Sequence, residues 1–107
     1  KTAQLAIARG LAEQTRGTGV TVNTVMPGPT RSEGIVDFIR SVVSNPDASE
    51  AEREKAFFDE LRPLSLIRRL IEADEIGSMV TYLASPLAAV TNGAAIRAEG
   101  GIIPTIA

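Results

Sequence analysis

The first apolar pattern in the chain is helical. In residues 1–16, apolar side chains recur at the three- and four-residue spacing of a helix face, at Leu5, Ala8, Leu11 and Ala12. Gly17 follows, and a glycine just past the last turn is a common way for a helix to end. The pattern therefore predicts a helix over residues 1–15.

The next pattern has the period of a strand. Residues 20–26, VTVNTVM, place alternate side chains on one face and are rich in β-branched residues. Val25 adds an apolar side chain to the opposite face, which is typical of a strand covered on both sides. The pattern predicts a strand over 20–26 that runs directly into Pro27-Gly28-Pro29.

Helical periodicity returns after this turn, in one stripe made of Ile35, Phe38, Ile39, Val42 and Val43. Ser49 and Glu52 have the spacing of a capping box, so they predict a second helix, whose apolar side is Ala56, Phe57 and Leu61. Pro63 would end that helix. Asp74 and Glu75 are favourably placed in the first turn of a third helix, with Ile76, Met79, Val80 and Leu83 on its apolar face.

The last segment, residues 93–101, predicts a short strand closed by two glycines. A strand, a helical crossover and a second strand form a βαβ unit, in which the strands are parallel and the connection is right-handed. The polar stretch at 45–54 is expected to be a mobile connection within one domain. The fold class predicted is α/β, with two parallel strands and flanking helices.

Composition excludes several classes of function. Of the 107 residues, 44% are hydrophobic and 22% are charged, which is ordinary for a globular domain. A net charge of −2 gives no reason to expect nucleic acid or an anionic membrane as partner. Without cysteine or histidine, a metal site would need carboxylates alone, so we expect no metal. No apolar run reaches membrane-spanning length and no signal peptide is visible, so we expect a cytoplasmic protein.

The turn at Pro27-Gly28-Pro29 is the strongest candidate for chemistry. Prolines stiffen the backbone and glycine leaves it bare, at the end of a strand where α/β sheets commonly bind ligands. Taken alone, the same residues form an ordinary turn, and Ser32 is an N-cap for the helix that follows. Arg68-Arg69 has two interpretations, a contact to a phosphate group and a solvated pair, of which the solvated pair is the simpler. Glu50, Glu52, Glu54 and Lys55 are interpreted as a solvated helix face.

Three segments resemble the short-chain dehydrogenase/reductase family. NTVMPGPTRSEG, residues 23–34, is similar to the segment in which Asn-x-Val-x-Pro-Gly leads into the nicotinamide contact. Residues 72–101 are similar to the family's C-terminal segment, which ends in Asp-Gly-Gly. Residues 1–13, KTAQLAIARGLAE, resemble the helix that starts at the lysine of Tyr-x-x-x-Lys. The resemblance covers essentially the whole chain. It implies that residues 1–107 are the C-terminal part of an NAD(P)-binding, Rossmann-like three-layer sandwich.

The resemblance also implies roles for individual residues. Lys1 would bind the nicotinamide ribose and lower the pKa of the catalytic tyrosine. A phenol with a pKa of about 10 needs a nearby cation to act as acid and base at neutral pH. Pro27, Gly28 and Pro29 would form the wall behind the nicotinamide ring. Backbone groups of Thr30 and the hydroxyl of Ser32, which replaces the family's usual threonine, would hold the carboxamide.

Residues 33–63 match the family's substrate lid, and the candidates to line an apolar substrate pocket are Ile35, Phe38 and Ile39. By periodicity alone, these three side chains are more simply interpreted as core. Two positions depart from the family pattern. Glu99 replaces the usual aspartate of Asp-Gly-Gly, and Arg97 interrupts the last strand. Both departures are expected to bear on assembly more than on chemistry.

The implied function of the parent protein is hydride transfer between NAD or NADP and a carbonyl or alcohol substrate, in a homo-oligomer. Lys1 is expected to be internal to a longer chain, with the catalytic tyrosine four residues before it; Tyr82 is no substitute. Residues 1–107 alone are therefore expected to be inactive. Two alternatives stay open. One is a non-catalytic half-fold that acts as an interaction or structural domain, and the other is a reductase-like protein that has lost its tyrosine.

Overall fold

The computed structural model describes residues 1–106, which form two compact units. The first unit contains residues 1–26 and 76–98, and the second contains residues 27–75 and those from 99 onward. Within residues 1–106, no helix is both long and apolar enough to cross a membrane. In chain order, the elements are α1 (Thr2–Gln14), β1 (Thr24–Pro27), α2 (Glu33–Val42), α3 (Glu50–Ala56), the π-helical turn η1 (Phe57–Leu61), α4 (Ala73–Leu83), the 3-10 turn η2 (Pro86–Ala88) and β2 (Ala95–Ala98).

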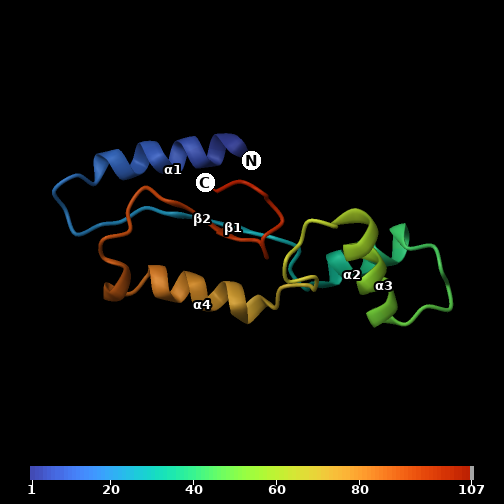
Figure 1. Ribbon diagram of the computed structural model, residues 1–107. Helices are drawn as coiled ribbons and strands as arrows, with labels where there is room; N and C mark the ends of the chain where they lie inside the picture. The colour runs from blue at the N-terminus through green and yellow to red at the C-terminus, as the bar shows by residue number, and fades with distance from the viewer. Residues whose placement is uncertain (107) are drawn as a thin grey trace. The chain divides into compact units, whose positions relative to one another are not determined.

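The first unit is built around the two parallel strands β1 and β2, with α1 on one face and α4 on the other (Figure 1). Residues leading into and along β1 alternate between these faces. Val22 and Thr24 line a cavity together with α1, whereas Asn23 and Val25 line one together with α4. This alternation confirms the predicted α/β fold class and the strand covered on both sides.

β1 begins later in the chain than the alternating pattern predicted, because two asparagine side chains make the contacts that a ladder would make. The Val22 N–H donates to Asn92 Oδ1 at 2.8 Å. Asn23 Nδ2 donates to the carbonyl oxygen of Thr91 at 2.8 Å, and Asn23 Oδ1 accepts from the Ala94 N–H at 3.1 Å. Before they pair as strands, the two segments are thus joined by side-chain amides and by a backbone bond from the Gly93 N–H to the carbonyl oxygen of Val22 at 2.8 Å.

The second unit has a small core made of Ile39, Phe57, Phe58 and Leu70. The predicted capping box is confirmed at the start of α3. The Ser49 N–H donates to Glu52 Oε2 at 2.7 Å, and Ser49 Oγ accepts from the Glu52 N–H at 3.3 Å. These two bonds satisfy N–H groups that the first helical turn leaves without partners.

The wider π turn η1 changes which side chains the second helix buries. Phe57 and Phe58 are consecutive, yet both are buried, and their rings meet edge to face with centroids 5.1 Å apart. Leu61, which the helical pattern placed on the apolar side, is 41% exposed. The prediction was wrong for Leu61 because it assumed α-helical spacing throughout.

We expect Phe57→Ala to lower the free energy of unfolding by about 3–5 kcal/mol, since it empties a fully buried site. The matched control is Leu61→Ala in the same turn, which should cost about 1 kcal/mol or less because Leu61 is partly solvated. Urea unfolding followed by circular dichroism measures both changes. Equal losses for the two variants would contradict the core described here.

Candidate cofactor site

The loop that follows β1 is fixed by backbone hydrogen bonds to Ile71. The Ile71 N–H donates to the carbonyl oxygen of Pro29 at 2.9 Å, and the Arg31 N–H donates to the carbonyl oxygen of Ile71 at 2.8 Å. Thr30 therefore pairs with Ile71 as a parallel β-bridge. In such a bridge Ile71 is bonded to Pro29 and Arg31, the two neighbours of Thr30. The N–H and C=O of Thr30 itself therefore point away from Ile71. The resemblance assigns these two groups to the nicotinamide carboxamide, and that assignment stays a prediction.

Gly28 is required by internal packing. A Cβ atom at this position would lie 2.7 Å from the carbonyl oxygen of Glu99 and 2.8 Å from its Cα. Sequence reasoning attributed this glycine to the approach of a flat ring. The structure gives it a further reason, because the backbone of Glu99 already occupies one side of the glycine.

Glu99 itself begins a tight turn. Gly100 and Gly101 follow with φ angles of 72° and 74°, in the left-handed region that favours glycine. Ile67 packs so closely on Gly100 that a Cβ there would lie 2.7 Å from its side chain. The Glu99 carboxylate accepts a hydrogen bond from the N–H of Ile102. This position, which departs from the family's aspartate, thus has a role in shaping the chain's own turn.

The two hydroxyl groups of the loop have local partners. Ser32 is the N-cap of α2, and its Oγ accepts from the Ile35 N–H at 3.4 Å. Thr30 Oγ1 donates to the carbonyl oxygen of Gly28 at 2.9 Å. A hydroxyl has one donor and two acceptor positions, so the cap leaves the Ser32 hydroxyl able to donate. Its capping role is shown, and its cofactor contact stays a prediction.

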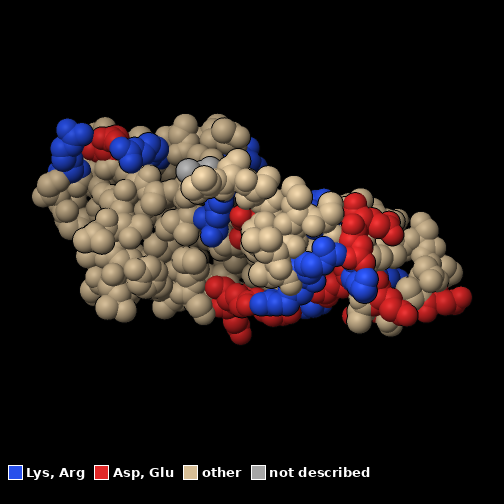
Figure 2. Space-filling model, in the orientation of Figure 1, with Lys and Arg blue, Asp and Glu red and all other residues tan. Residues whose placement is uncertain are grey.

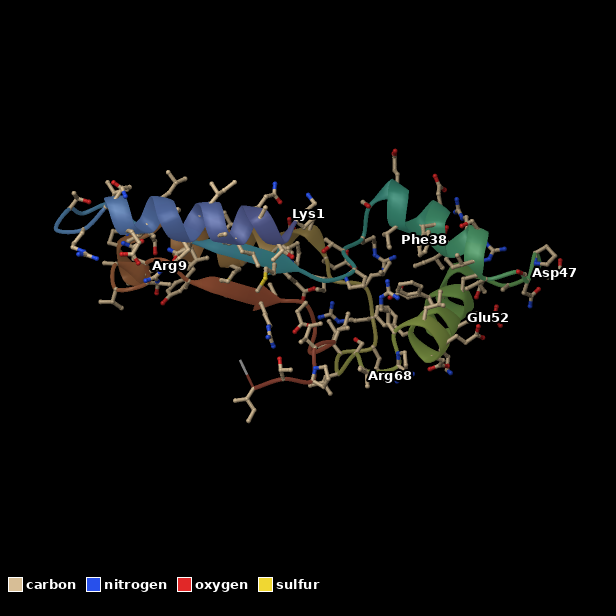
Figure 3. The ribbon with its side chains drawn as sticks, turned by 90° about the horizontal axis from the view of Figure 1, so that it is seen from above. Lys1, Arg9, Phe38, Asp47, Glu52 and Arg68 are labelled. Atoms are coloured by element: carbon tan, nitrogen blue, oxygen red, sulfur yellow. The ribbon has the colours of Figure 1, made fainter. Side chains whose placement is uncertain are left out.

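Lys1 lies in the first unit, immediately before α1 (Figure 3). It is exposed, and its carbonyl oxygen accepts a hydrogen bond from the Gln4 N–H at 2.9 Å. The loop residues 27–32 belong to the second unit. The catalytic role that the resemblance gives Lys1 stays a prediction.

The three candidate lid residues have different surroundings. Ile39 is buried in the core of the second unit, and Ile35 packs against that core. Phe38 is 46% exposed, although its ring meets that of Phe57 edge to face at 6.4 Å. Of these three side chains, that of Phe38 is the most exposed, and its ring has solvent-facing area for a substrate (Figure 3).

Sequence reasoning missed Arg31, which joins three segments of the second unit. Arg31 Nη2 donates to Glu54 Oε2 at 2.9 Å, and Arg31 Nε donates to Glu72 Oε1 at 2.9 Å. These bonds, the Glu72 one first, raise the pKa of Arg31. Glu54 was interpreted as solvated surface, but its side chain is only 19% exposed. A sequence signal is lacking because the partners are far apart in the chain.

Arg68 and Arg69 also have partners. Arg69 donates through both terminal nitrogens to the carboxylate of Glu75, at 2.7 Å each, and Arg68 pairs with Asp59. The Arg69 bonds, helped by a bond from the Glu72 N–H, lower the pKa of Glu75 to about 2. Figure 2 shows such charged side chains gathered on the second unit. Both arginines are exposed, as the sequence was interpreted, and each also has a carboxylate partner that the sequence did not indicate.

We expect Gly28→Ala to lower the free energy of unfolding by about 1–3 kcal/mol, because the backbone of Glu99 must move. Gly34→Ala is the matched control, since the nearest atom to a Cβ there is Ser32 Oγ at 4.0 Å. That variant should be as stable as the wild type or gain about 0.5–1 kcal/mol. Thermal and urea unfolding measure both, and a Gly28→Ala protein as stable as Gly34→Ala would contradict the close approach.

Glu75 predicts a dependence of stability on pH. Its pKa is about 2 in the folded state against an ordinary value of 4.5, so the ionised form stabilises the fold. This contribution is complete above pH 4.5 and is lost as the pH falls from 4.5 toward 2. We expect the urea midpoints of wild type and Glu75→Gln to differ at neutral pH and to converge in acid. Glu60→Gln, on the exposed side of η1, is the control. A difference in urea midpoint between wild type and Glu75→Gln that persists in acid would refute this prediction, and so would an equal pH-dependent difference for Glu60→Gln.

Comparison with known proteins agrees with the resemblance. A family model described as enoyl-(acyl carrier protein) reductase matches residues 1–103. The uncharacterised oxidoreductase YvaG of Bacillus subtilis (strain 168) is 48% identical over 106 residues, which are 99% of this chain and 40% of that protein. The chain thus spans about two fifths of the length of this curated relative.

Two solved structures extend the comparison. A short-chain dehydrogenase/reductase from Serratia marcescens is 34% identical with a TM-score of 0.70, over 95% of this chain and 35% of that one. An actinorhodin polyketide ketoreductase, solved with NADPH, is 25% identical with a TM-score of 0.71, over 92% of this chain and 36% of that one. With a family model that matches nearly its whole length, this chain belongs to the short-chain dehydrogenase/reductase family.

Proposed function

We propose that the protein containing this chain is an oxidoreductase that transfers a hydride between NAD(P) and a carbonyl or alcohol substrate. The observation that carries this proposal is the Thr30–Ile71 bridge, which holds a bare loop at the end of β1. It turns one backbone donor and one backbone acceptor of Thr30 away from Ile71. A primary carboxamide, as in nicotinamide, needs one donor and one acceptor of this kind.

The loop fits a nicotinamide on physical grounds. Pro27 and Pro29 restrict the backbone, and the bridge to Ile71 fixes it further, so little conformational freedom is left to lose on binding. The Ser32 hydroxyl retains a donor beside its role as N-cap. When bound, NAD(P)H supplies the hydride, and these residues orient the ring that carries it. NADPH is the first cofactor to test, because the related ketoreductase was solved with it.

We propose that Lys1 holds the nicotinamide ribose and keeps a catalytic tyrosine acidic enough to exchange a proton with the substrate oxygen. The full-length protein must then carry a tyrosine four residues before Lys1. An exposed ammonium at the start of α1 suits this role, because it is not committed to the packing of its own unit.

A homo-oligomer is also proposed. Two large apolar side chains of α1, Ile7 and Leu11, are 63% and 55% exposed in the single chain. Exposed apolar area of this kind on one helix is typical of a surface that a second subunit covers. The cytoplasmic location stays a prediction.

The cofactor contact of Ser32 can be separated from its capping role. Glycine caps a helix nearly as well as serine, so Ser32→Gly should cost only a few tenths of a kcal/mol in stability. Because it removes the hydroxyl, we expect it to raise the Kd for NADPH by about two- to tenfold, the value of one hydrogen bond. Ser32→Thr keeps the hydroxyl and should bind within about twofold of the wild type.

Titration of NADPH fluorescence with the full-length protein measures these constants, and urea unfolding measures the stability of each variant. Failure of the wild type to bind NADPH or NADH would refute the proposed function. Unchanged binding by Ser32→Gly would remove Ser32 from the cofactor site while leaving its capping role.

A further inference from the structure

Three segments of the second unit meet at the carboxylate of Glu54. One oxygen, Oε2, accepts from Arg31 of the loop after β1 at 2.9 Å. The other, Oε1, accepts from the backbone N–H of Leu70 at 2.8 Å. Glu54 itself lies on α3, within the predicted lid. A single carboxylate therefore ties a lid helix both to the loop and to the segment at Leu70.

The loop and the segment at 70–72 are also joined directly, because Thr30 and Ile71 form the parallel bridge. Arg31 adds a second side-chain bond, from Nε to Glu72 at 2.9 Å. The guanidinium of Arg31 is thus held by two carboxylates on different segments. A shift of α3 would pull on Arg31, and Arg31 is the neighbour of Thr30 in the chain.

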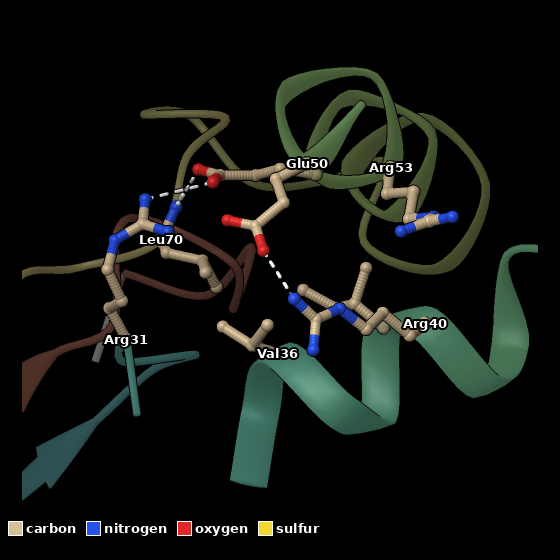
Figure 4. A pocket seen from close by; sticks show the side chains of 8 residues that line it. Arg31, Val36, Arg40, Glu50, Arg53 and Leu70 are labelled. Atoms are coloured by element: carbon tan, nitrogen blue, oxygen red, sulfur yellow. Dashed lines mark hydrogen bonds and ion pairs between the residues drawn. The ribbon is translucent and has the colours of Figure 1, made fainter. Parts of the chain in front are cut away.

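The Arg31–Glu54 pair is more sheltered than the other ion pairs of the lid. The side chain of Glu54 is 19% exposed, and Leu70, whose N–H it accepts from, is buried. Together with Arg31 they line a cavity of about 20 Å³, room for about one water molecule (Figure 4). A charge-assisted bond in such surroundings is stronger than one in open solvent.

A second ion pair on the same cavity provides a comparison. Arg40 of α2 donates to Glu50 of α3 at 2.5 Å, with 49% and 65% of the two side chains exposed. This pair joins the two lid helices to each other and makes no bond to the loop (Figure 4). It has the same chemistry as the Arg31–Glu54 pair, but it is more exposed and connects different segments.

We propose that Arg31 is a positioning residue that couples the lid to the cofactor loop through its pair with Glu54. The pair fixes α3 relative to the peptide groups of Thr30. The position of the lid therefore also determines how the Thr30 N–H and C=O are placed to bind the carboxamide. The inference rests on the proposed function for its effect on cofactor binding. The coupling between lid and loop does not depend on that function.

Glu54→Gln in the full-length protein is the sharpest test. The glutamine carbonyl can still accept from the Leu70 N–H, but the charge that holds Arg31 is lost. Glu50→Gln removes the same charge from the same helix and is the matched control. Arg31→Ala and Arg31→Lys test the other partner, which lies on the surface and is 41% exposed, so both variants should fold.

Two readouts are needed. The Kd for NADPH reports on the carboxamide geometry, and amide hydrogen exchange without cofactor reports on residues 27–32 and 50–56. We expect Glu54→Gln and Arg31→Ala to weaken NADPH binding about fivefold and to speed exchange in both segments, because the competent loop position becomes less populated. Glu50→Gln should leave the Kd within about twofold and the exchange of 27–32 unchanged. Arg31→Lys keeps the charge and should lie nearer the wild type than Arg31→Ala.

The proposal is overturned if Glu54→Gln and Glu50→Gln change the Kd equally, or if Arg31→Lys is no better than Arg31→Ala. If the wild type binds neither NADPH nor NADH, the proposed function fails, and hydrogen exchange alone decides the coupling. Faster exchange of residues 27–32 in Glu54→Gln but not in Glu50→Gln then supports the coupling, and equal exchange overturns it.

Discussion

The backbone bridge between Thr30 and Ile71 determines where the loop after β1 lies. It consists of two hydrogen bonds, and these fix the two peptide groups on either side of Thr30 and turn the N–H and C=O of Thr30 away from Ile71. Gly28 is packed against Glu99 within the same unit, where no Cβ fits. A loop constrained by its backbone in this way needs little help from side chains to stay rigid. A site built on it is therefore organised before any ligand arrives.

Ion pairs also join segments of the same unit. Most of its ion pairs are exposed, and exposed pairs contribute little to stability one at a time. The pairs of Arg31 are different in what they connect, since they join the loop to both α3 and the segment before α4. These pairs fix the position of the loop relative to α3 and the segment before α4, more than they add to total stability. For this reason a function is assigned to Arg31 and none to Arg40, whose pair with Glu50 joins only the two lid helices.

Local patterns in the sequence predicted the parts of the fold that local physics determines. Alternation along residues 20–26 predicted the strand and its two covered faces, and the Ser49 and Glu52 spacing predicted the cap of α3. The π turn was missed because one extra residue per turn leaves no mark in the periodicity, so Leu61 was misplaced and Phe58 overlooked. The reason for Gly28 and the role of Glu54 were missed because each depends on a partner distant in the chain. The roles of Lys1, Thr30 and Ser32 came from family resemblance and stay predictions. The structure shows that the N–H and C=O of Thr30 point away from Ile71 and that Ser32 is the N-cap of α2.

The central claim is that the bridged loop is the nicotinamide contact. The most direct measurement is amide hydrogen exchange of the wild-type, full-length protein with and without saturating NADPH. Added protection in residues 27–32 and in the bridged segment 70–72 is the result that the claim predicts, because a bound carboxamide would hold Thr30 and, through it, Ile71. Saturable binding of NADPH with unchanged exchange in both segments would contradict it.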